Sequence, residues 1–205
     1  MSVVSWNKSP MEVIQAFESR RKDRGSAGGA LALWAAWAVE GLHYLDDLDQ
    51  AHTSNPLSHA GHHPHIIDIA HVRWATGTSI TSLDLCAAVL GRECCAWTNP
   101  NELDLRDFDP AGGKDVITQR RALLPAPALG WVDGALSDTR YTEIQGARNP
   151  LTHSRLIRRF VLSNPRTDFV VTATGTTFAA RELVVLAKEL AQDQVSAFLE
   201  VLDRL

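Results

Sequence analysis

The segment from Thr177 to Leu205, TFAARELVVLAKELAQDQVSAFLEVLDRL, decides the fold class. Its apolar residues recur at steps of three and four, which is the spacing of one face of an α-helix. Thr177 is well suited to cap the start of this helix. The segment predicts a long C-terminal helix that packs on other helices through Leu183, Leu186, Leu190, Val195, Phe198, Leu202 and Leu205.

Two β-prone segments precede this helix. LIRRFVLS, residues 156–163, and DFVVTAT, residues 168–174, are rich in the branched and aromatic residues that favour strands. The four residues NPRT, 164–167, lie between them and are typical of a turn. The sequence therefore predicts one small β-hairpin before the C-terminal helix.

Helical periodicity covers most of the remaining chain. A capping box at Ser9-Pro10-Met11-Glu12 opens a predicted helix at residues 9–22. Further helices are predicted at residues 30–50, at residues 69–90 and, interrupted by Pro125 and Pro127, at residues 114–136. The pattern predicts a mainly α fold, a helical bundle with one β-hairpin, in a single domain of residues 1–205. In the second of these helices we expect the core face to comprise Trp34, Trp37, Ala38, Gly41, Leu42, Leu45 and Leu48.

The composition is ordinary for a water-soluble protein, with 45% hydrophobic and 21% charged residues. A net charge of −4 provides no whole-protein attraction to nucleic acid or to an anionic membrane, so a polyanion would need a local basic surface. Residues 140–166 form one such basic segment. Against a single carboxylate, Glu143, this segment carries Arg140, Arg148, Arg155, Arg158, Arg159 and Arg166.

Cysteine usage and hydropathy indicate the compartment. Cys86, Cys94 and Cys95 lack the spacing of a disulfide framework or of a structural zinc site, which fits a reducing environment. The uncharged stretch at residues 25–39 is shorter than the roughly 20 apolar residues that span a bilayer. We therefore expect a cytoplasmic protein that does not bind a membrane.

The sequence RNPLTH, residues 148–153, lies within the basic segment. Asparagine is a good helix cap and proline favours the first helical position, so a helix is expected to start at Pro150 with Asn149 as its cap. Arg148 could then fold back toward His153 in the first turn. Backbone N–H groups at a helix start attract anions, arginine binds phosphate, and histidine exchanges protons near neutral pH. The pattern is compatible with an anion site beside a proton-transfer group, but taken by itself it favours a helix start that has only a structural role.

RNPLTH resembles the marker motif of the HEPN superfamily, whose small α-helical domains carry an arginine, usually a polar residue, and then a histidine. Arg148 and His153 match the Arg-X4-His pattern, with Asn149 as the polar residue. The helical hairpins before the motif, and the β-hairpin and long helix after it, are also similar to bacterial HEPN-like proteins. The specific part of the resemblance covers residues 141–159.

The resemblance implies a metal-independent endoribonuclease that needs no cofactor and acts as a homodimer, with the motifs of two protomers meeting in a cleft. Carried onto this sequence, His153 is the general base for a ribose 2′-OH. Arg148 stabilises charge on the phosphate, and Asn149 positions one or the other. RNA carries its own nucleophile, so the protein needs only to move a proton and stabilise charge.

The resemblance also implies partners. RNA is the expected substrate, and Arg155, Arg158 and Arg159 are expected to hold flanking phosphates. A role in defence, or as a toxin with a cognate antitoxin or a nucleotidyltransferase-type partner, follows from the family. Toxins paired with a minimal nucleotidyltransferase often carry a tyrosine at the position of Arg155, so that particular regulation is not expected. The alternative is a catalytically silent HEPN-like module for RNA binding, protein binding or dimerisation.

A histidine-rich segment, HAGHHPHIIDIAH at residues 59–71, could bind zinc or nickel. Its spacing fixes no coordination geometry, so a polar surface loop is the preferred interpretation and no metal is assigned. A third hypothesis is a structural or metal-binding helical protein in which RNPLTH only caps a helix. The residues concerned are His59, His62, His63, His65, Asp68 and His71.

Overall fold

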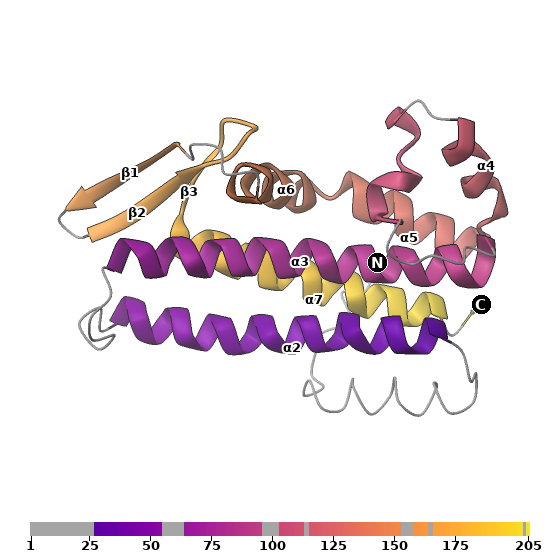
Figure 1. Ribbon diagram of the computed structural model, residues 1–205, viewed down its shortest axis with the longest axis horizontal. Coiled ribbons are helices and arrows are strands. Elements are labelled where there is room, and N and C mark those ends of the chain that lie inside the picture. Colours follow the sequence, from indigo (N-terminus) through magenta and orange to yellow (C-terminus); the bar gives the residue numbers. More distant parts are fainter. Residues whose placement is uncertain are drawn as a thin grey trace. The chain divides into compact units, whose positions relative to one another are not determined.

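The structure is a computed structural model that describes residues 27–54, 64–95, 103–112, 115–152, 158–163, 166–202 and 204–205. Most of its elements are helices, which confirms the expected mainly α fold (Figure 1). They are α2 (Ala27–Ser54), α3 (Pro64–Cys95), α4 (Asp115–Leu123), α5 (Ala126–Ser137), α6 (Thr139–Thr152) and α7 (Ala180–Leu202), with two short 3-10 helices, η3 (Leu105–Phe108) and η4 (Pro110–Gly112). The predicted helix at residues 9–22 lies outside the described residues. Within the described part of the chain, no helix has both the length and the apolar character needed to cross a membrane.

The chain forms two compact units. Among the described residues, the first comprises those of 27–40, 81–137 and 192–205, and the second comprises those of 41–80 and 138–191. The long helices α2, α3 and α7 each contribute residues to both units. The single-domain organisation expected from the sequence stays a prediction.

The interior of the first unit is built around an aromatic pair. Trp131 of α5 lies against Phe198 of α7, with ring centroids 4.9 Å apart, and Phe198 is fully buried. The indole N–H of Trp131 donates a hydrogen bond of 2.9 Å to the carbonyl oxygen of Gln194, which satisfies its one polar atom. Leu105 and Phe108 of η3 are buried as well. Phe198 is therefore a core residue, as its position on the apolar face of the predicted C-terminal helix indicated.

A small antiparallel sheet belongs to the second unit. The predicted hairpin is confirmed, with β1 (Arg158–Ser163) paired to β2 (Arg166–Val171). A third strand, β3 (Thr177–Ala179), pairs with the other edge of β2, which the sequence did not predict (Figure 1). The expectation that Thr177 caps the last helix is therefore wrong, because these residues form ladder hydrogen bonds with β2 and α7 begins at Ala180. Glu182 supplies the cap, accepting a hydrogen bond of 2.8 Å from the N–H of Ala179.

The buried face of α2 differs from the predicted one. Trp34 and Trp37 are 58% and 44% exposed, and their rings contact each other edge to face. In the first unit, the side chains of α2 that are buried are smaller, which allows neighbouring helices to approach closely. They are Ala32, Leu33, Ala35, Ala36 and Val39. The prediction that both tryptophans lie in the core is thus wrong, whereas Leu42 and Leu45 are buried in the second unit as expected.

The three cysteines should differ in reactivity. Burial, with a smaller contribution from Asp84, raises the pKa of the Cys86 thiol far above its usual range, whereas Cys94 and Cys95 are partly exposed. Alkylation requires the thiolate, so Cys86 in the native protein should react on the order of 1000-fold more slowly than a free cysteine. Mass spectrometry after alkylation at pH 8 measures this, with urea-unfolded protein as the control that modifies all three. Rapid native modification of Cys86 would contradict its placement in the core.

Candidate functional site

The motif predicted from the sequence lies at the end of α6, not at the start of a helix. Helix α6 runs from Thr139 to Thr152 and passes through the Asn149-Pro150 step, so the predicted helix start at Pro150 is wrong. A helical residue at position 150 would donate its N–H to the carbonyl of Gly146, and proline has no N–H to donate. The N–H of Ala173 donates to that carbonyl instead, at 3.2 Å. This replacement hydrogen bond lets the helix continue past the proline.

The position of the motif reverses the electrostatic argument made from the sequence. The last turn of a helix presents carbonyl groups with partial negative charge, and these do not attract phosphate. Arg148 and Asn149 both lie in this region of α6 and are partly exposed. A cationic Arg148 complements the negative helix end. Attraction of an anion here would therefore depend on side chains and not on backbone N–H groups.

The other candidate residues are placed only in part. His153 and Arg155 lie outside the described residues. Arg158 and Arg159 open β1, where their Cα partners across the hairpin are Val171 and Val170. Arg148 and Asn149 are thus neighbours on α6, in the same unit as Arg158 and Arg159. The proposed general base, His153, is not among the described residues.

The turn between β2 and β3, residues 172–176, docks on α6 (Figure 1). The Glu143 carboxylate accepts hydrogen bonds from Thr172 at 2.8 Å, from Thr174 at 2.6 Å and from Thr176 at 2.8 Å. Partial burial raises the pKa of the Glu143 carboxyl, but the three hydroxyl hydrogen bonds outweigh it and bring the pKa below its usual value. The carboxylate is therefore ionised at neutral pH. We call Glu143 and these three threonines the threonine clamp.

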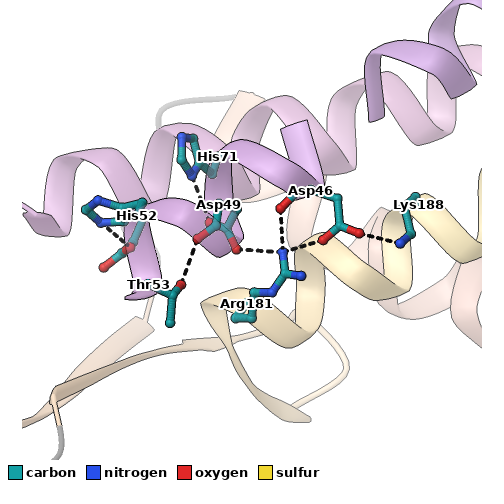
Figure 2. Close-up of polar contacts among 8 residues, drawn as sticks. Asp46, Asp49, His52, Thr53, His71, Arg181 and Lys188 are labelled. Carbon is teal, nitrogen blue, oxygen red and sulfur yellow. Dashed lines mark hydrogen bonds and ion pairs between the residues drawn. The ribbon is translucent and has the colours of Figure 1, made fainter. Parts of the chain in front are cut away.

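A second polar cluster, which the sequence analysis did not predict, fastens α7 to α2 within the second unit (Figure 2). Arg181 of α7 contacts the carboxylates of both Asp46 and Asp49, and Lys188, further along α7, pairs with Asp46. Burial raises the pKa of the Asp46 carboxyl, but hydrogen bonds and charges from Lys188 and Arg181 outweigh it and hold the pKa below its usual value. Two carboxylates of α2 are thus paired with two cationic side chains of α7.

The same cluster continues to α3 through two histidine–carboxylate pairs. His71 Nδ1 lies 2.8 Å from Asp49 Oδ1, and His52 Nε2 lies 3.1 Å from Asp68 Oδ1. The two imidazole rings meet edge to face, with centroids 5.9 Å apart (Figure 2). A carboxylate that orients an imidazole is an arrangement used in acid–base catalysis. His71, however, is only 12% exposed, so the geometry supports a structural role in joining three helices.

These pairs also bear on the predicted histidine-rich segment. Asp68 and His71 lie on α3 and face residues of α2, whereas His59, His62 and His63 lie outside the described residues. In the part of the chain that the structure describes, no group of three or more histidine, cysteine, aspartate or glutamate side chains is arranged to hold a metal ion. One sequence feature could have predicted the polar cluster. In LDDLDQAH, residues 45–52, Asp46, Asp49 and His52 recur at three-residue steps, on the same side of α2 as the apolar core.

Comparison with known proteins adds no further identification: no family model, curated protein or solved structure matches the chain.

Proposed function

We propose that this protein is a HEPN-like endoribonuclease that cleaves RNA without a metal ion through Arg148 and His153. One observation carries the proposal: Arg148 and Asn149 are both partly exposed on the end of α6 that leads directly into His153. Arg158 and Arg159 follow in the same basic segment and the same unit. In this arrangement the arginine side chains, and not the backbone of α6, supply the attraction for a chain of phosphates.

The proposed reaction uses the nucleophile present in RNA. His153 removes the proton of a ribose 2′-OH, and the 2′-oxygen forms a bond to the adjacent phosphorus. The bond from phosphorus to the 5′-oxygen breaks, and that oxygen leaves as an alcohol after it takes up a proton. Arg148 stabilises the negative charge on the non-bridging oxygens, and Asn149 positions the arginine or the base. We expect two copies of the chain to form the RNA cleft, in a cytoplasmic protein of defence or toxin–antitoxin type.

A metal-free cleavage assay tests this proposal. In EDTA, we expect RNA cleavage by the wild-type protein and a loss of about 100- to 10,000-fold in His153→Ala, because a positioned acid–base group contributes about that much. Arg148→Ala should lower the rate to a similar degree. Thr142→Ala, an exposed change on the same helix, is the matched control and should retain the wild-type rate. A substrate of the same sequence in which a 2′-deoxynucleotide replaces every ribonucleotide should not be cleaved.

The second candidate function is RNA binding without cleavage. The placement of Arg148 at the carbonyl end of α6 favours it over cleavage, because no backbone N–H groups there can stabilise the charge that develops on a phosphate in the transition state. Binding that weakens with salt and on changing Arg158 and Arg159, together with no cleavage, would support this candidate. Full cleavage activity in both His153→Ala and Arg148→Ala would rule out the proposed mechanism.

A further inference from the structure

In the threonine clamp, Glu143 with Thr172, Thr174 and Thr176, the glutamate lies on α6 five residues, about 1.4 helical turns, before Arg148. We infer that this clamp is a positioning device that sets the place of Arg148 and Asn149 for contact with an RNA phosphate. The inference rests on the proposed function and adds residues that the sequence motif does not include. It is carried by three observations on the contact between one turn and one helix.

The first contact is the carboxylate itself. Oε2 of Glu143 accepts from Thr172 and Thr174, and Oε1 accepts from Thr176, so both oxygens are held. Hydrogen bonds to an ionised group are about twice as strong as neutral ones. Thr172 is buried, and Thr174 and Thr176 are exposed. A side chain held at both oxygens fixes the rotation of α6 relative to the turn.

The second contact is the backbone hydrogen bond from Ala173 to Gly146. Pro150 leaves the Gly146 carbonyl without its intrahelical donor, and the turn supplies one at 3.2 Å. Without it, the last turn of α6 would carry an additional unsatisfied carbonyl and would fray more easily. Because Arg148 lies between Gly146 and Pro150, the docked turn supports the segment that carries the motif arginine.

The third observation is the close approach that the turn requires. A Cβ atom on Gly146 would lie 3.3 Å from the backbone nitrogen of Ala173 and 3.6 Å from the Cβ of Thr172. Any larger residue at position 146 would therefore push the turn away from α6. The turn itself depends on Gly175, whose φ of 91° lies in the left-handed region. Gly146 in α6 and Gly175 in the turn thus both allow the turn to dock on α6.

Loss of the clamp should affect catalysis more than substrate binding. A displacement of about 1 Å at a reacting group can lower the rate about 100-fold. Contacts from the flanking arginines to distant phosphates should be less sensitive to such a shift. A clamp that positions Arg148 therefore predicts a fall in kcat with little change in KM, whereas a clamp that only stabilises the fold predicts a lower melting temperature and normal kcat at low temperature.

The test compares the double variant Thr174→Val/Thr176→Val with the matched control Thr174→Ser/Thr176→Ser, which keeps both hydroxyls. Both positions are exposed, so the valine variant should fold. We expect kcat for RNA cleavage in EDTA to fall about 10- to 100-fold in the valine variant, with KM changed less than about threefold. The serine variant should retain most of the wild-type rate. Hydrogen exchange at residues 147–152 should accelerate in the valine variant only.

The possible results test the clamp inference and the proposed nuclease activity separately. If the wild-type protein binds RNA without cleaving it, the proposed function fails. Faster exchange at residues 147–152 in the valine variant, with the same small loss of RNA affinity as in Arg148→Ala, then still supports positioning. Unchanged exchange in that variant overturns the clamp, whether or not RNA is cleaved. Faster exchange with unchanged kcat and RNA affinity also overturns it, because the contact is then structural only. A wild-type protein that neither binds nor cleaves RNA overturns both proposals.

Discussion

Replacing Asp49 by alanine should lower the free energy of unfolding by about 3 kcal/mol. Asp49 is 2% exposed, and its two oxygens lie 2.8 Å from Nδ1 of His71 and 3.1 Å from Arg181. Removing one member of a buried ion pair leaves the remaining charges without compensation and costs about 3–5 kcal/mol. The lower end applies because Arg181 keeps its contacts with the carboxylate and the carbonyl oxygen of Asp46.

Urea unfolding followed by circular dichroism measures this change, and the chain offers a matched control. Asp47 is exposed on the same helix, so Asp47→Ala should alter the free energy of unfolding by no more than about 0.5 kcal/mol. Asp49→Asn, which keeps the shape but not the charge, should have an intermediate effect. Equal effects at positions 47 and 49 would show that the observed pairing contributes little. A double-mutant cycle with His71→Ala isolates the contribution of the Asp49–His71 pair.

The elements that the sequence predicted well are those decided by local pattern. The hairpin has β-prone segments on both sides of a turn, and α7 has a long amphipathic period, so neither needed knowledge of distant residues. Strand β3 was missed because three residues carry too little pattern of their own. Its extended conformation depends on the free edge of β2, with Val170 facing Phe178 in the register. Such a strand is set by its partner and not by its own propensity.

The predicted core face of α2 illustrates a different limit. Two stripes of the helix are apolar, one with tryptophans and one with alanines, and periodicity alone does not say which stripe is buried. Close helix packing selected the alanine stripe and left Trp34 and Trp37 exposed. Hydrophobicity scales favour the larger residues, whereas the space between neighbouring helices favours the smaller ones.

The sequence placed the candidate site residues at a helix start, whereas the structure places Arg148 and Asn149 at the end of α6. Asn149-Pro150 carries the local signals of a helix start, and a hydrogen bond from Ala173, distant in sequence, overrides them. The threonine clamp could not be predicted because a glutamate and a threonine-rich turn are each ordinary surface features when read alone. The pairing of Asp46 and Asp49 with Arg181 and Lys188 was missed for the same reason, since acids on a helix usually face water.

Phe198→Ala should lower the free energy of unfolding by about 3–5 kcal/mol, the usual cost of truncating a buried phenylalanine. Phe198 is fully buried and loses its contact with the Trp131 ring, which then borders a cavity. Trp34→Ala in the same unit removes a larger side chain that is 58% exposed, and it should cost less than about 1 kcal/mol. Urea unfolding of the two variants shows whether Trp34 belongs to the core, as Phe198 does, or lies at the surface. If Trp34 lay in the core, as its helical spacing predicted, its truncation would cost about as much as that of Phe198, because the lost free energy follows burial and not the size of the residue.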